Sequence, residues 1–142
     1  MLDFLKSLDI LQGMDDAQIE RLHSLLQVES LSAGHVIFNE GDPGDDFFIV
    51  KSGTVGIVKN LNKPKAVTLA TLRSKDFLGE MGPLSGKPRG AAACCKDDVV
   101  LLRMRKHDFL AFIADNPLLS MNLRAIMARR RSDNLETSFK KT

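Results

Sequence analysis

The sequence contains no tryptophan, no tyrosine and only two cysteines among its 142 residues. Without the two larger aromatic residues, the chain has few stacking platforms for single-stranded nucleic acid. The adjacent Cys94 and Cys95 cannot link distant parts of a fold by a disulfide, so we expect reduced thiols and a cytoplasmic protein. On a strand the two would point to opposite faces, and core packing is favoured over a redox role for Cys95.

Long apolar runs and a strong excess of charge are also missing. No stretch approaches the ~20 apolar residues of a membrane helix, so no membrane span is predicted. The N-terminus carries Asp3 and Asp9 instead of a basic and then apolar signal sequence, so export is not expected. The net charge is only +2, which gives no global signature of nucleic-acid binding.

Residue patterns typical of catalysis or metal binding are scarce. The histidines are scattered at His23, His35 and His107, without metal-ligand spacing. Asp42, Asp45 and Asp46 lack the spacing of a calcium loop and are expected to form turns. We therefore expect no enzyme, no catalytic residues, no metal and no cofactor.

Short apolar segments alternate with turn residues through the middle of the chain. The expected strands are 27–31, 35–39, 46–51, 54–59, 66–72, 76–78, 90–95 and 99–105. The breaks between them are rich in glycine, proline, asparagine, aspartate and serine. Many short strands at this spacing predict a sandwich or a barrel.

Helical patterns flank these strands. Asp15 and Gln18 form a predicted capping box at the start of one helix. A second helix is expected over 107–114, and Asn116 with Pro117 predicts the start of a long helix running toward residue 135. We expect one domain over 1–142, with N-terminal helices in 1–26, strands in 27–105 and C-terminal helices in 106–142.

The stretch 77–92, here called the cassette, has the composition of a folded loop. It holds four glycines and two prolines, with Glu80 and Arg89 toward its two ends. Arg89 offers a planar fork of donors suited to a phosphate, and the small residues Gly90 and Ala91 let backbone N–H groups approach the same anion. The carboxylate of Glu80 suits a sugar hydroxyl. The alternative is an ordinary salt bridge between Glu80 and Arg89.

The cassette resembles the phosphate-binding cassette of the cyclic-nucleotide-binding domain family, which includes the catabolite activator protein and kinase regulatory subunits. The resemblance rests on Gly79-Glu80 and on Pro88-Arg89-Gly90-Ala91, and the glycine-punctuated segment 40–58 supports it. It implies a mainly β fold with flanking helices (α+β). Its centre would be an eight-stranded jelly-roll-like β-roll, with N-terminal helices and two C-terminal helices. We expect a stand-alone bacterial domain, although a fragment of a larger protein is an alternative.

The resemblance also assigns roles to residues. Glu80 would bind the ribose 2′-hydroxyl and Arg89 the cyclic phosphate. The other implied ligand-binding residues are Gly79, Met81, Gly90 and Ala91, with tentative base contacts from Leu69 and Asn134. Gly90 lacks the hydroxyl that a threonine at this position offers to cyclic GMP in the family, which favours cAMP over cGMP.

The implied function is a sensor that couples binding of cAMP or cGMP to movement of the helices in 106–142. The alternative is a β-roll interaction or dimerisation module that binds another small ligand or none. Expected partners are a homodimer through the helix 117–135 and an unknown effector protein. DNA binding is not expected without an additional domain, and Arg129, Arg130 and Arg131 are better explained as a solvated helical face.

Overall fold

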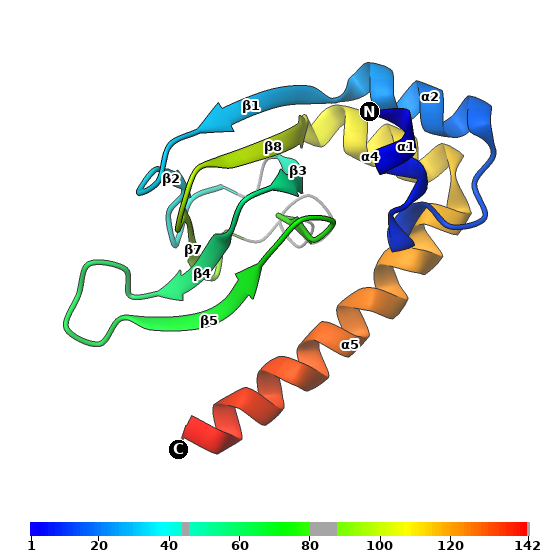
Figure 1. Cartoon of the computed structure of the whole chain (residues 1–142). Helices are drawn as coiled ribbons and strands as arrows, with labels where there is room; N and C mark the ends of the chain where they lie inside the picture. Colours follow the sequence, from blue (N-terminus) through cyan, green and yellow to red (C-terminus); the bar gives the residue numbers. More distant parts are fainter. Residues whose placement is uncertain (44–45, 80–87, 142) are drawn as a thin grey trace. The chain divides into compact units, whose positions relative to one another are not determined.

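The computed structural model describes residues 1–43, 46–79 and 88–141, with only the helical backbone for 130–141. The chain divides into two compact units (Figure 1). One unit contains residues 26–110, and the other combines residues 1–25 with 111–142. Each unit is described by itself below.

The unit of residues 26–110 contains two four-stranded antiparallel sheets. The first has the order β1 (Gln27–Leu31), β8 (Val99–Met104), β3 (Phe47–Ser52) and β6 (Phe77–Leu78). The second has the order β2 (Val36–Phe38), β7 (Ala92–Cys95), β4 (Val55–Lys59) and β5 (Val67–Leu72). Figure 1 shows β8 beside β1, and β4 beside β5. This architecture confirms the predicted fold class, mainly β with flanking helices.

Apolar residues from both sheets form one core. Its buried members are Phe48, Val50, Val55, Leu72, Leu78, Ala93, Cys95, Val99 and Leu101. β3 is buried on both faces, because Phe48 and Val50 enter this core while Phe47 contacts aromatic rings elsewhere. The ring of Phe47 stacks on that of Phe109 in α4 (Lys106–Asp115), with 4.4 Å between centroids and 16° between planes. The first turns of α4 are thereby fixed to β3.

The turn between β3 and β4 meets the turn between β7 and β8. The backbone N–H of Thr54 donates to the Asp97 carboxylate at 2.7 Å, and the N–H of Lys96 donates to the Thr54 carbonyl at 2.9 Å. These bonds satisfy backbone groups that the strands leave unpaired at their ends. They also fix the start of β8 relative to β3.

The second unit is helical. It contains α1 (Leu2–Lys6), the 3-10 helix η1 (Asp9–Leu11), α2 (Asp16–Leu25), the end of α4 and α5 (Pro117–Lys141). The predicted capping box of α2 is confirmed, because the Gln18 N–H donates to Asp15 Oδ1 at 2.8 Å and the Asp15 N–H donates to Gln18 Oε1 at 3.2 Å. In α5, the Asn122 amide donates to the Ile10 carbonyl at 3.0 Å. That bond holds η1 against α5.

The junction between α4 and α5 lies at Asn116, as predicted. α5 begins at Pro117, and the Leu119 N–H donates to the Asn116 carbonyl at 3.0 Å. The buried side-chain amide of Asn116 donates backward, to the Phe112 carbonyl at 2.9 Å. The side chain of Asn116 therefore caps the C-terminal end of α4, and its carbonyl accepts a hydrogen bond from the first turn of α5.

Some expectations differ from the structure. β7 begins at Ala92, so Gly90 and Ala91 precede the strand that was expected to include them. The last helix continues beyond residue 135 to Lys141. Both cysteines are buried, and burial raises the pKa of the Cys95 thiol, which disfavours the redox alternative. Among the described helices, none has the length and apolar character needed to cross a bilayer.

Candidate functional site

The backbone of Arg89 is fixed by the segment that follows β2. The Arg89 N–H donates to the Asp42 carbonyl at 2.8 Å, and the Gly41 N–H donates to the Arg89 carbonyl at 2.7 Å. The segment around Gly41 keeps its own turn because the Asn39 N–H donates to Asp42 Oδ2 at 2.8 Å. Asp42 thus serves as a turn former, as predicted, and presents its carbonyl to Arg89.

The guanidinium of Arg89 is held in one orientation. Its Nη1 donates to the Gly79 carbonyl at 2.7 Å and its Nη2 donates to the Asp46 carbonyl at 2.6 Å. The cation lies over the Phe38 ring, 4.4 Å from the centroid, and the residue is only 8% exposed. The two carbonyls orient the fork without removing its positive charge, which is the arrangement that an anion site needs.

Gly79 permits this approach because it has no side chain. Its φ is +87°, a left-handed conformation that residues with a Cβ rarely adopt. A Cβ at this position would lie 2.6 Å from the Asp46 carbonyl oxygen and 3.0 Å from Arg89 Nη1. The glycine is therefore required both by the backbone turn and by the close approach of Arg89.

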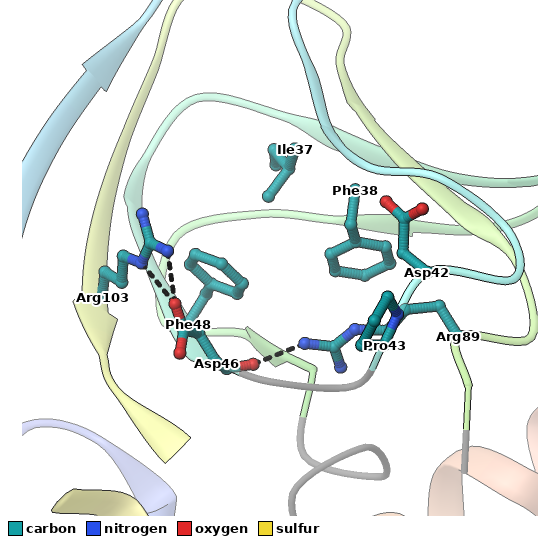
Figure 2. A pocket seen from close by; sticks show the side chains of 8 residues that line it. All are labelled: Ile37, Phe38, Asp42, Pro43, Asp46, Phe48, Arg89 and Arg103. Carbon is teal, nitrogen blue, oxygen red and sulfur yellow. Dashed lines mark hydrogen bonds and ion pairs between the residues drawn. The ribbon is translucent and has the colours of Figure 1, made fainter. Parts of the chain in front are cut away.

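A hollow of about 180 Å³ lies beside the guanidinium (Figure 2). Its lining residues are Ile37, Phe38, Asp42, Pro43, Asp46, Phe48, Arg89 and Arg103. Figure 2 shows the rings of Phe38 and Phe48 on one side and the guanidinium of Arg89 directed toward Asp46. The hollow combines an apolar wall with cationic donors, which suits an organic anion better than a simple ion.

Arg103 is a second cation of this hollow, and it is paired with two carboxylates. Its Nε donates to Asp46 Oδ2 at 2.6 Å, its Nη2 forms an ion pair with the same carboxylate, and its Nη1 donates to Glu29 at 3.0 Å. The hydrogen bonds to Glu29 and then to Asp46 raise the pKa of Arg103 above its ordinary value. Arg103 therefore stays charged, but its charge is shared with two acids.

Arg103 and the carboxylate of Asp46 were not predicted from the sequence as parts of the site. Arg103 is a lone charge in the apolar strand β8, which is a detectable signal. Its register opposite Phe48 places it beside the start of β3, but a register is not readable from one sequence. Residues 46 and 103 are separated by 57 positions, so only the paired strands bring them together.

The predicted phosphate cradle is partly within the described residues. Gly79 and Arg89 are in direct contact, as given above. Among the described residues, no atom lies within 4 Å of where a Cβ at Gly90 would stand, and the Gly90 carbonyl accepts from Lys59 Nζ at 3.2 Å. Ala91 is buried next to it. Glu80 and Met81 lie outside the described residues, together with 82–87.

The two predicted base contacts belong to different units. Leu69 lies on β5 with 37% of its surface exposed and is not among the described residues that line the hollow. Asn134 belongs to α5 in the helical unit, and its contact with a base stays a prediction. Within the described part of the chain, no group of three or more histidine, cysteine, aspartate or glutamate side chains could hold a metal ion.

Comparison with known proteins decides the family. The family model described as "Cyclic nucleotide-binding domain" matches residues 28–116, which is more than half of the chain. The chain belongs to the cyclic nucleotide-binding domain family. The match covers both sheets, the segments that supply Arg89 and Asp46 to the hollow, and Gly79, whose carbonyl holds Arg89. It also covers α4.

Two curated relatives of this family show similar sequences over most of the chain. A "CRP-like cAMP-activated global transcriptional regulator" of Mycobacterium tuberculosis is 31% identical over 130 residues, which are 92% of this chain and 58% of the relative. A "Cyclic AMP receptor protein" of Thermus thermophilus is 32% identical over 133 residues, 93% of this chain and 62% of the relative. The chain therefore spans about three fifths of the length of these relatives.

Solved structures of the family have the same fold. The crystal structure of the Thermus thermophilus catabolite activator protein superposes with a TM-score of 0.80 at 31% identity, over 94% of this chain and 63% of that one. A cyclic nucleotide-binding domain from Methylobacillus flagellatus gives 0.84 at 20% identity, over 99% and 82%, and supports the fold alone. The predicted family and fold are confirmed.

Proposed function

We propose that this chain is a sensor that binds a cyclic nucleotide at the hollow beside Arg89, with cAMP preferred over cGMP. The observation that carries the proposal is the orientation of the Arg89 guanidinium by the carbonyls of Gly79 and Asp46. A planar fork fixed in this way can bind two phosphate oxygens with little further ordering. Similar proteins include a cAMP-activated regulator and a cyclic AMP receptor protein, which favours the same ligand.

The proposed contacts follow the cassette. Arg89 would bind the cyclic phosphate, with backbone groups of Gly79, Gly90 and Ala91 around it, and Glu80 would accept from the ribose 2′-hydroxyl. Met81 would flank the ligand, and Leu69 and Asn134 remain proposed base contacts. The preference for cAMP rests on Gly90, which offers no hydroxyl to a guanine base.

The proposed output is movement of the C-terminal helices. Binding at Arg89 would favour one of two arrangements of the hinge in 106–114, and the helix that begins at Pro117 would follow. The proposal includes a homodimer through the helix 117–135 and an effector protein. Met121, which is 65% exposed on α5, is a contact available to such a dimer, whereas Leu119 and Leu123 are buried. Sedimentation of the protein with and without Met121→Glu tests this dimer.

Calorimetric titration of cAMP and cGMP into the protein and into Arg89→Ala tests the proposed function. Removing one partner of a buried charged hydrogen bond costs about 2–5 kcal/mol. The variant should therefore bind roughly 30-fold to a few thousand-fold more weakly. Glu80→Gln keeps the shape of the side chain, and we expect a smaller loss.

Arg73→Ala is the matched control, because it removes the same charge from an exposed turn. Its affinity for cAMP should equal that of the parent. Equal affinities of Arg89→Ala and the parent would contradict the proposed site. Absence of binding to either nucleotide would favour the alternative, a β-roll kept for another ligand or for protein contacts.

A further inference from the structure

Asp46 joins three separate segments of its unit. Its backbone carbonyl accepts from Arg89 Nη2 at 2.6 Å, its Oδ2 accepts from Arg103 Nε at 2.6 Å, and its Oδ1 accepts from the Lys106 backbone N–H at 3.2 Å. Figure 2 shows the first two of these contacts on opposite sides of the residue. We infer that Asp46 is a positioning residue that links the guanidinium of Arg89 to the first turn of α4. The functional meaning of this link rests on the proposed function.

The contact with Lys106 stabilises the beginning of a helix. Lys106 is the first residue of α4, and the first N–H groups of a helix have no partner within it. A carboxylate there supplies an acceptor and a negative charge near the positive end of the helix dipole. The side chain of Asp46 is only 14% exposed, so water replaces this acceptor poorly.

The neighbouring residue strengthens the same connection. Phe47 follows Asp46 and stacks on Phe109, which lies one turn along α4. Residues 46 and 47 therefore hold the first turn of the helix by a charged hydrogen bond and by a ring contact. A shift at the start of β3 must change both contacts, because they are made by the first residue of β3 and the residue immediately before it.

Arg103 limits how far Asp46 can adjust. Its guanidinium binds the Asp46 carboxylate through Nε and Nη2, and Glu29 holds it from the other side. The carboxylate therefore cannot rotate freely to keep its bond to Lys106 when the carbonyl of Asp46 moves. A displacement of Asp46 caused by loss of its bond to Arg89 therefore weakens its bond to the Lys106 N–H at the start of α4.

A double-mutant cycle in the ligand-free protein tests this link without any nucleotide. Hydrogen exchange of the Lys106 backbone amide is measured by NMR in the parent, Arg89→Ala, Asp46→Ala and the double variant. Asp46→Ala removes the carboxylate and keeps the carbonyl. We expect Arg89→Ala to accelerate exchange at Lys106 at least about twofold in the parent background and not in the Asp46→Ala background.

Asp98→Ala is the matched control background. It removes a carboxylate that accepts from a different backbone N–H, that of Ala33 at 3.0 Å, and keeps the two carboxylates bound to Arg103. The effect of Arg89→Ala on Lys106 should persist in it. If either alanine variant fails to fold, Arg89→Lys and Asp46→Asn replace it, since each keeps part of the native contact.

Two results would overturn the inference. One is an equal effect of Arg89→Ala on Lys106 exchange in the parent and Asp46→Ala backgrounds. The other is no effect in either background.

Addition of cAMP to the parent protein is a separate experiment. Failure to bind cAMP would reject the proposed function while the cycle still decides whether Asp46 makes the link.

Discussion

Arg89 is oriented by two backbone carbonyls, and this has a consequence for which residues can be replaced. A carbonyl acceptor depends on the path of the chain and not on the identity of its side chain. The two positions therefore have different requirements. Position 79 must have no side chain, because a Cβ would contact Asp46 and Arg89. At Asp46 the carbonyl orients Arg89, whereas the carboxylate binds Arg103.

Gly79→Ala should weaken cAMP binding, because its Cβ would press on the Asp46 carbonyl and on Arg89. Gly34→Ala is the matched control, since Gly34 has nearly the same φ, +88°, and no atom within 4 Å of an added Cβ. Each variant should lose about 1–2 kcal/mol of stability from the left-handed backbone alone. Only Gly79→Ala should also lose affinity in a calorimetric titration. Equal affinities of the two variants would show that the contact with Arg89 does not matter.

Gly90→Thr should raise the affinity for cGMP relative to cAMP. Within the part of the chain that the structure describes, no atom lies within 4 Å of a Cβ added at this position. One added hydrogen bond contributes about 0.5–1.5 kcal/mol, which shifts the ratio of the two affinities by roughly 2- to 12-fold. Competition titrations of both nucleotides measure this ratio. Gly90→Val, which has a similar shape without the hydroxyl, should leave the ratio unchanged.

Helix and strand boundaries were the part of the fold that local residue chemistry predicted well. The capping box of Asp15 and Gln18 and the helix start after Asn116 need only neighbouring residues, and both are confirmed. The β7 boundary was wrong by two residues, because Gly90 and Ala91 have no local signal that separates them from a strand. The order of strands in the sheets, and hence the Asp46–Arg103 pair, depends on contacts between distant residues.

Asn116→Ala should lower the free energy of unfolding by about 1–3 kcal/mol, because it leaves the Phe112 carbonyl without its buried donor. Urea denaturation measures this change. Asn122→Ala is the comparison, since that amide also donates to backbone carbonyls but is only partly buried. Water can replace it more easily, so its loss should be smaller. A larger loss for Asn122→Ala would contradict the argument from burial.

In the unit of residues 26–110, the fold buries two cysteine thiols whose exposure could not be determined from the sequence. Cys94 and Cys95 lie on β7 between β2 and β4, and both are buried. Burial raises the pKa of Cys95, so less of the reactive thiolate is present at a given pH. The cassette could be recognised from its own residues, whereas the surroundings of these thiols required the complete fold.

Alkylation of the cysteines by iodoacetamide should be much slower in the native protein than in urea, because it requires the sheets to open. Saturating cAMP should slow it further. A ligand that binds only the folded state adds about 2.7 kcal/mol at a concentration 100 times its dissociation constant. Where opening is global and reversible, this corresponds to roughly 100-fold slower alkylation. Arg89→Ala should show no such protection, and equal protection of the variant would contradict the proposed site.

β8 is the strand that connects the first sheet, since it is bonded to β1 on one side and to β3 on the other. Among the described residues it is also the last strand. A ribosome releases β1 and β3 well before residues 99–104, so during synthesis the two strands have no partner between them. The link from Arg89 through Asp46 to α4 therefore cannot form in the growing chain until β8 has emerged. We therefore expect that shorter nascent chains cannot couple nucleotide binding to α4, and that the coupling begins once β8 has paired with β1 and β3.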